Sequence, residues 1–322
     1  MALIRDLREK SGAPISDVKA ALVEAQWSID NAFQALRKKG LAAATKKASR
    51  HAAEGLVGIA KGDGAAAVVE INSETDFVAR NDQFRHLVGS VAAAALRAEA
   101  ALPSGNIGEL DIESLAAAPT TSGSSVGDAV SDVAGTVREN IKLRRAHRLS
   151  CPDGVIASYL HTSPAPGLGR MGALVALQDA QGPIGAEKAT RVEELGTKLA
   201  MHAVAVKPLF LSRASVSKEA LEAEKDVLRE QAAKTGKPAN IIEKMLQGRL
   251  NKYYEENCFL EQKFVMDDSK KVQAVVKELG QELDLDLQLS GFVRLQCGEG
   301  LEKSASKDFA TEVAETLEQA VA

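Results

Sequence analysis

The stretch GLVGIAKGDGAAAVVEINSETDFVARND, Gly55–Asp82, predicts most of one α+β unit. Its apolar runs "GLVGIA" and "AAAVVEI" are typical of strands, and the glycines of the intervening "KGDG" indicate a hairpin turn. The run "NDQFRHLVGSVAAAALRAEA" that begins at Asn81 has helical spacing, with Asn81 or Asp82 as its N-cap. The predicted order is therefore strand, turn, strand, corner, helix.

Phe77 lies at this strand-to-helix corner, beside Asp76. In one interpretation the ring turns inward and plugs the corner, as a lone aromatic in a loop usually does. In the other, Asp76 and Phe77 project together as a polar and apolar probe into a partner. The residues alone leave both interpretations open.

The same order of elements recurs further along the chain. The runs "GVIASYLH", "TSPAPGLG" and "RMGALVALQ" read as strand, loop and strand, and "EKATRVEELGTKLAMHAVA" reads as a helix. The two copies share a pattern rather than residues. We therefore expect two α+β halves with a common core.

Helical segments flank these halves. Three short amphipathic segments come first: "ALIRDLREK", "ISDVKAALVEA" after Pro14, and "SIDNAFQALRKK", with Ser28 as a cap and Gly40 as a stop. They predict a compact docking module. Further on, two helices joined by "TGKP" predict a helical hairpin in which Gly236 ends one helix and Pro238 begins the next. A helix, the strand "LQLSGFVRLQ" and a final helix "KDFATEVAETLEQA" close the chain.

Composition is that of an ordinary soluble protein of two or three domains: 322 residues, 45% hydrophobic and 26% charged. The net charge of -4 argues against a general nucleic-acid coat. Cys151, Cys258 and Cys297 are far apart and predict reduced structural thiols in a reducing compartment. The sequence shows neither a bilayer-spanning stretch nor a secretion signal, so we expect no membrane partner.

The motifs that could carry chemistry are weak. "GLGRMG", Gly167–Gly172, matches GxGxxG, but a strand-like run rather than a helix follows it, so the match predicts no nucleotide site. The histidines are scattered and lack zinc-helix spacing, and no nucleophile elbow is present. We therefore expect no catalytic residue, no metal site and no cofactor.

The run "KLRRAHR", Lys142–Arg148, is the best candidate for nucleic-acid contact. It lies in a predicted strand, "IKLRRAHRLS", whose basic residues we expect to face outward. Aromatic residues for base stacking do not interleave it, and a solvated strand face explains it equally well. An RNA- or ribosome-binding protein stays an alternative function, although direct nucleic-acid binding is not expected.

Many segments resemble the elongation factor Ts family. The opening "LREKSGAPISDVKAALVEAQWSIDNAFQALRKKG" is similar to its N-terminal module, and "NSETDFVARNDQF" to its signature. The resemblance continues through "LAMHAVAVKPLFLS", "GKPANIIEKMLQGRLNKYYEE" and "GFVRLQCGEGLEK", nearly to the end. Two departures are Val18, where the family often has Cys, and the long loop "HTSPAPGLGRMG". Both the loop and "AAEGLVGIA" resemble alphaproteobacterial and plant mitochondrial members.

The resemblance implies an α+β fold with a ubiquitin-associated-like three-helix domain, a two-part core with a helical hairpin, and a C-terminal module. On this sequence the expected units are residues 1–52 with the connector, 53–145, 146–290 with the hairpin at about 216–256, and 291–322. These boundaries follow the family and the composition shifts together.

The resemblance also implies a function. Family members promote GDP release from elongation factor Tu, binding its GDP-bound and nucleotide-free forms, and are not enzymes in the chemical sense. The turn Thr75, Asp76, Phe77 and Val78 would insert beside the partner's magnesium site, with Arg80, Asn81 and His161 as further contacts. The similarity to plant mitochondrial members predicts the mitochondrial matrix, with the transit peptide absent from this chain, and the bacterial cytoplasm is the alternative.

Overall fold

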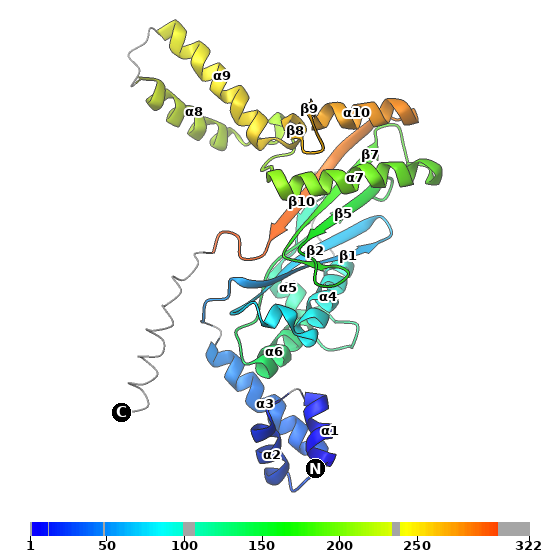
Figure 1. Ribbon diagram of the computed structural model, residues 1–322, viewed down its shortest axis with the longest axis vertical. Coiled ribbons are helices and arrows are strands. Elements are labelled where there is room, and N and C mark those ends of the chain that lie inside the picture. Colours follow the sequence, from blue (N-terminus) through cyan, green and yellow to red (C-terminus); the bar gives the residue numbers. More distant parts are fainter. Residues whose placement is uncertain (1, 12, 48, 99–106, 234–238, 302–322) are drawn as a thin grey trace.

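A computed structural model describes residues 2–11, 13–47, 49–98, 107–233 and 239–301. Two β-sheets pack face to face, and a long helix covers the outer face of each (Figure 1). One apolar cluster lies between the two sheets. A second lies between the first sheet and its helices, and a third between the second sheet and its helices. The result is the α+β architecture that the sequence predicts.

The first sheet contains the hairpin predicted by Gly55–Asp82. Strands β1 (Glu54–Gly62) and β2 (Ala65–Ser73) pair antiparallel, and Gly64 adopts a positive φ of 62° in the turn between them. Three further strands complete the order β3-β4-β2-β1-β6: β3 (Ile107–Glu109), β4 (Lys142–Ser150) and β6 (Leu168–Gly169). All nine residues of β2 are buried, as expected of a strand covered on both faces.

The second sheet repeats the order of elements. Strands β5 (Val155–His161) and β7 (Met171–Asp179) precede helix α7 (Ala186–Val206), as β1 and β2 precede α4 (Asp82–Arg97). The edge strand β10 (Leu287–Gln296) pairs with β7, giving the order β10-β7-β5. The predicted repetition of strand, strand and helix is therefore confirmed.

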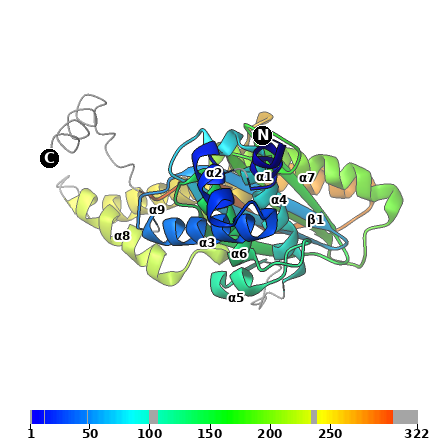
Figure 2. The same cartoon turned by 90° about the horizontal axis from the view of Figure 1, so that it is seen from below.

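Helices α1 (Ala2–Ser11), α2 (Ile15–Glu24) and α3 (Ile29–Lys47) form the predicted N-terminal module around a small core of its own. The predicted stop at Gly40 is wrong, because α3 continues to Lys47. Gly40 instead lies against Gly135 of α6 (Val126–Val137), where a Cβ on Gly135 would come within 2.8 Å of the Gly40 backbone. The glycine pair permits a close helix crossing on the core (Figure 2).

The smaller elements connect these layers. Helix α5 (Ile112–Ala117) precedes α6, and a two-stranded sheet of β8 (Lys263–Phe264) and β9 (Asp267–Lys271) precedes α10 (Val272–Leu283). Single turns of 3-10 helix lie at η1 (Val78–Arg80), η2 (Arg213–Ser215) and η3 (Phe259–Glu261).

Helices α8 (Lys218–Ala233) and α9 (Ala239–Asn257) form the predicted hairpin, which projects from one end of the molecule (Figure 1). Its connection, with Gly236 and Pro238, lies outside the described residues, as does the predicted final helix. Two expected domain boundaries, after residues 145 and 290, fall inside β4 and β10. Both strands are continuous because they hydrogen-bond to β2 and β7 along their length.

Within the described residues, no helix is long and apolar enough to cross a membrane. Cys151, Cys258 and Cys297 are all free and buried, so the prediction of unpaired structural thiols is confirmed.

Candidate functional site

The corner between β2 and α4 turns Phe77 toward solvent. The residue is 73% exposed, whereas its neighbours Val78 and Ala79 are each only 7% exposed. Val78 and Phe84 join the core of the first half and fill the inside of the corner. Phe77 therefore does not plug the corner, and its ring takes no part in the core that Val78 and Phe84 join.

Charged side chains flank the ring. Arg80 donates a hydrogen bond to Asp76 across 3.1 Å, and its guanidinium carbon lies 5.9 Å from the centre of the Phe77 ring. Both charged side chains are more than half exposed, so their ion pair contributes little to stability. The corner thus presents an acid, an aromatic ring and a base that the fold itself hardly uses.

Asn81 ends the corner by capping α4. Its Oδ1 accepts hydrogen bonds from the backbone N–H groups of Gln83 (2.8 Å) and Phe84 (3.2 Å). The predicted cap is confirmed, and with it the point at which the helix begins.

Glu139 holds the opposite end of the corner, and no pattern in the sequence connects it with Thr75. The carboxylate of Glu139 accepts hydrogen bonds from the backbone N–H of Thr75 (2.9 Å) and from its Oγ1 (2.6 Å). Glu139 follows α6 and is 64 residues away in the sequence. Only the folded chain brings it to the corner.

His161 is exposed at the end of β5, with its Nδ1 3.1 Å from the Tyr159 hydroxyl. Its carbonyl accepts from the backbone N–H of Arg170, whose guanidinium pairs with Glu54. Glu54 lies opposite Ser73, the last residue of β2. His161 and the corner after β2 therefore lie at the same end of the two packed sheets.

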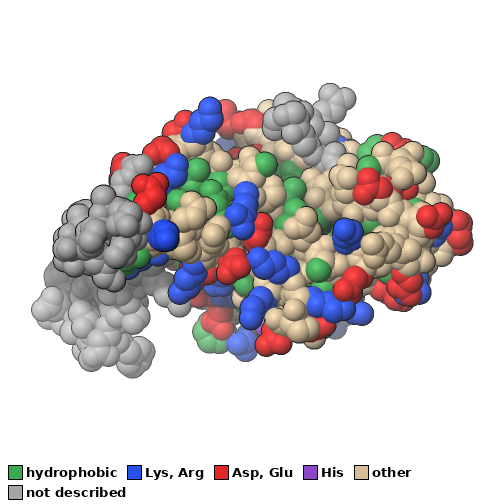
Figure 3. All heavy atoms as spheres, turned by 90° about the horizontal axis from the view of Figure 1, so that it is seen from above, with side chains coloured by type: hydrophobic (Ala, Val, Ile, Leu, Met, Phe, Trp, Pro, Cys, Tyr) green, Lys and Arg blue, Asp and Glu red, His purple; other side chains and the backbone are tan. Residues whose placement is uncertain are grey.

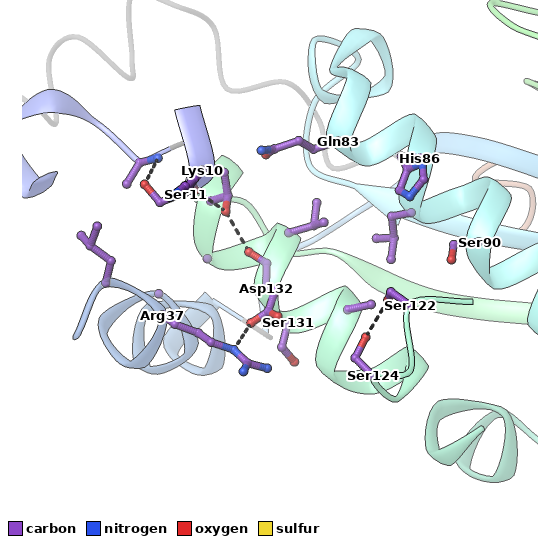
Figure 4. Close-up of a pocket in the computed structure, with 18 of the residues that line it drawn as sticks. Lys10, Ser11, Arg37, Gln83, His86, Ser90, Ser122, Ser124, Ser131 and Asp132 are labelled. Atoms are coloured by element: carbon purple, nitrogen blue, oxygen red, sulfur yellow. Dashed lines mark hydrogen bonds and ion pairs between the residues drawn. The ribbon is translucent and has the colours of Figure 1, made fainter. Parts of the chain in front are cut away.

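A groove of about 640 Å³ runs from the N-terminal module to the first turn of α4 (Figure 4). Its walls come from α1 and α3 on one side and from α4 and α6 on the other, joined by the Arg37–Asp132 ion pair at 2.9 Å. A neighbouring hollow includes Phe77 and Val78 in its lining, and the two share Gln83 and Thr136. One continuous concave surface thus connects the module to the exposed ring.

Comparison with known proteins decides the family. The family described as Elongation factor TS matches residues 74–299, which include the corner and His161. Elongation factor Ts of Paramagnetospirillum magneticum is 49% identical over 315 residues, covering 97% of this chain and 95% of that protein. The chain belongs to the elongation factor Ts family. It is thus a nucleotide exchange factor of translation elongation.

Similar relatives are both bacterial and mitochondrial. Elongation factor Ts of Rhodospirillum rubrum is 46% identical over 318 residues, covering 99% of this chain and 98% of that protein. The mitochondrial elongation factor Ts of Oryza sativa subsp. japonica is also 46% identical, over 312 residues, covering 94% of this chain and 84% of that protein.

The two central arginines of the basic strand β4 do not face outward as expected. A β-bulge opposite Glu70 brings both Arg144 and Arg145 onto the fully buried Glu70 carboxylate, at 2.9 and 2.6 Å. Burial also lowers the pKa of His147, which favours its neutral form. The two central arginines balance a buried acid, which leaves the nucleic-acid alternative without its main support.

The face seen from above carries charges of both signs (Figure 3). Lys and Arg side chains are interspersed with Asp and Glu there rather than gathered by sign (Figure 3). A nucleic-acid surface would concentrate the basic residues.

The "GLGRMG" run has a structural explanation in this family member. It forms β6 and the start of β7, with no helix after it, and the Gly167 carbonyl accepts from the Ile59 N–H at 2.8 Å. A Cβ on Gly172 would lie 2.9 Å from the Leu160 side chain. The glycines allow close packing of the loop against β1 and β5, and the expectation that this match marks no dinucleotide fold is consistent with the strand that follows.

No group of three or more His, Cys, Asp or Glu side chains suited to a metal ion occurs in the described part of the chain. The candidate contacts are the corner residues and His161.

Proposed function

We propose that this protein releases GDP from elongation factor Tu by pressing the turn Thr75–Val78 against the partner's nucleotide site, near its magnesium ion. The observation that carries the proposal is the 73% exposure of Phe77 beside buried Val78. Large apolar side chains held outward on a rigid corner are suited to fill a pocket in a partner.

Phe77 and Asp76 would have different tasks. The ring would wedge between elements of the partner and displace backbone that shapes the nucleotide site. The acid would perturb the ligands and waters of the magnesium ion, which prefers an undistorted octahedral set of oxygens. GDP would then lose part of its phosphate clamp without any covalent chemistry, so the protein is an exchange factor rather than an enzyme and needs no cofactor of its own.

Linkage makes the action reversible. A factor that weakens GDP binding must itself bind less tightly when GDP is present, so returning nucleotide expels it. The factor would therefore bind both the GDP-bound and the nucleotide-free partner, and more tightly the latter.

The remaining contacts would hold the protein on its partner while the turn acts. Arg80 and Asn81 border the turn, His161 would touch a second domain of the partner, and residues 1–52 would dock on the nucleotide domain. The groove that joins the N-terminal module to the corner offers a concave surface for that docking. Anchoring at separated points keeps the turn aimed at one site.

We also propose the mitochondrial matrix as the compartment, with the bacterial cytoplasm as the alternative. Similarity to mitochondrial relatives from plants supports the first, and similarity to bacterial relatives supports the second.

Release of labelled GDP from purified elongation factor Tu, with and without the protein, tests the proposal. Asp76→Asn keeps the side-chain shape but removes the charge, so it should preserve complex formation and weaken release most at high magnesium. Unstimulated release with the unaltered protein would contradict the exchange function. Stimulated release that is insensitive to changes at both Asp76 and Phe77 would contradict the role of the turn.

A further inference from the structure

Three consecutive residues, Arg138, Glu139 and Asn140, join parts of the chain that are remote in sequence. They connect α6 to β4, and together they contact three other segments of the chain. Glu139 bonds to the corner between β2 and α4, and Arg138 pairs with the N-terminal module. Asn140 bonds both to the corner and to the connector that follows the module.

The contact of Glu139 with Thr75 fixes the first residue of the turn. Its two carboxylate oxygens accept from both donors of Thr75, the backbone N–H at 2.9 Å and Oγ1 at 2.6 Å. The carbonyl of Thr75 accepts from the Ser73 hydroxyl at 2.9 Å. Backbone donor and acceptor are thus both engaged immediately before Asp76 and Phe77, and hydrogen bonds to a carboxylate are stronger than neutral ones.

A second contact runs in the opposite direction between the same two segments. The carboxylate of Glu74 accepts from the backbone N–H of Asn140 at 2.6 Å, and the Asn140 side chain donates to the Arg50 carbonyl at 2.7 Å. Each segment therefore supplies one acid to the backbone of the other. Two opposed bonds of this kind restrain sliding as well as separation.

Arg138 carries the connection to the N-terminal module. It ends α6 in the left-handed region, with φ at 61°, and its guanidinium pairs with Asp17 of α2. Its carbonyl accepts from the side chain of Lys47, the last residue of α3. The module and the corner are therefore attached to neighbouring residues of one short connection.

We propose that Glu139 is a positioning residue for nucleotide exchange, which holds the Thr75–Val78 turn at the angle at which Phe77 and Asp76 act. The inference rests on the proposed function of the turn. Glu139 itself touches no partner in this mechanism. It reduces the motion of the turn, so that the binding energy gained by the docked module is not lost in ordering the corner.

The test separates the rate of release from the affinity for the partner. For each full-length variant, GDP release from elongation factor Tu is measured against protein concentration. We expect Glu139→Ala to lower the maximal release rate about tenfold or more, since small misplacements of reacting groups have effects of this size. The concentration for half-maximal release should change by less than about twofold, because the docking contacts remain.

Three variants control the measurement. Glu139→Gln retains an acceptor and a donor that can face Thr75, so it should restore most of the rate. Thr75→Val removes only the hydroxyl and should lower the rate without adding further loss to Glu139→Ala, since both changes break the same contact. Glu113→Ala, at an exposed acid of α5, should leave the rate unchanged.

The outcomes distinguish the two proposals. A normal maximal rate for Glu139→Ala, with Phe77→Ala inactive, overturns the positioning role and leaves the exchange mechanism intact. Normal rates for both overturn the mechanism itself. If Glu139→Ala does not fold, a normal maximal rate for Thr75→Val overturns the role of the Glu139–Thr75 contact.

Discussion

Two corners of this protein join a strand to a long helix, and they turn their apolar side chains in opposite directions. Between β7 and α7, Ile184 is half-buried and packs against the core of the second half. Between β2 and α4, Phe77 faces solvent while the smaller Val78 turns inward. The repeated order of elements thus requires an inward apolar residue at each corner, but nothing in it requires an exposed ring.

The two corners also differ in how the start of the helix is held. Gly185 precedes α7 without a side-chain cap, whereas Asn81 caps α4 and Glu139 holds Thr75 before it. The corner with the exposed ring is therefore the more firmly tied of the two. Such restraint on a surface turn is what a contact residue needs if it is to press on a partner.

The sharpest test of this contrast compares two phenylalanines seven residues apart. Phe84 is fully buried, so Phe84→Ala should destabilise the protein by about 3 to 5 kcal/mol. Thermal or denaturant unfolding measures the loss. A cost near that of a surface change would mean that α4 does not anchor the first half.

Phe77→Ala is the matched change on the outside of the corner. Its free energy of unfolding should change by no more than about 0.5 kcal/mol, as for most surface truncations. The maximal rate of GDP release should fall at least about tenfold, equivalent to about 1.4 kcal/mol in the barrier. A large drop in melting temperature would show that the ring supports the fold after all.

Ile184→Ala should reverse this pattern at the other corner. Loss of a half-buried side chain should cost about 1 kcal/mol of stability, near the centre of the range for point changes. Below the melting transition, the maximal rate of GDP release should be unchanged, because α7 begins in the other half of the molecule. Slower release at full folding would show that both corners contribute to exchange.

The last expected effect concerns pH. His202 of α7 is buried like Phe84 of α4, but it titrates, and burial lowers its pKa below the usual 6.5. Below about pH 6.5 the unfolded chain binds this proton first, so stability is lost as pH falls through the folded pKa. The contribution of one such group changes by at most about 1.4 kcal/mol per pH unit.

Unfolding of the unaltered protein and of His202→Gln between pH 7.5 and 5 checks this expectation. The variant should show the flatter dependence, with the remainder due to groups such as His147, whose pKa burial also lowers. Identical slopes would show that His202 is not responsible.

Elements with local signals were predicted well from the sequence. The glycine turn between β1 and β2, the Asn81 cap and the repeated order of strand, strand and helix depend on residues close together in the chain. The resemblance to the family predicts the corner and His161 as contact residues, and this stays a prediction. The sequence could not decide whether Phe77 faced inward or outward, because either direction suits a loop aromatic.

Tertiary structure decided the features that depend on distant residues. Gly40 lies within a helix and packs against Gly135, and Arg144 and Arg145 turn to a buried Glu70 on a neighbouring strand. Glu139 reaches Thr75 across 64 residues of sequence. A glycine or a charge has the same local preferences wherever its partner lies, so only packing of the chain determines which groups approach closely enough to override them.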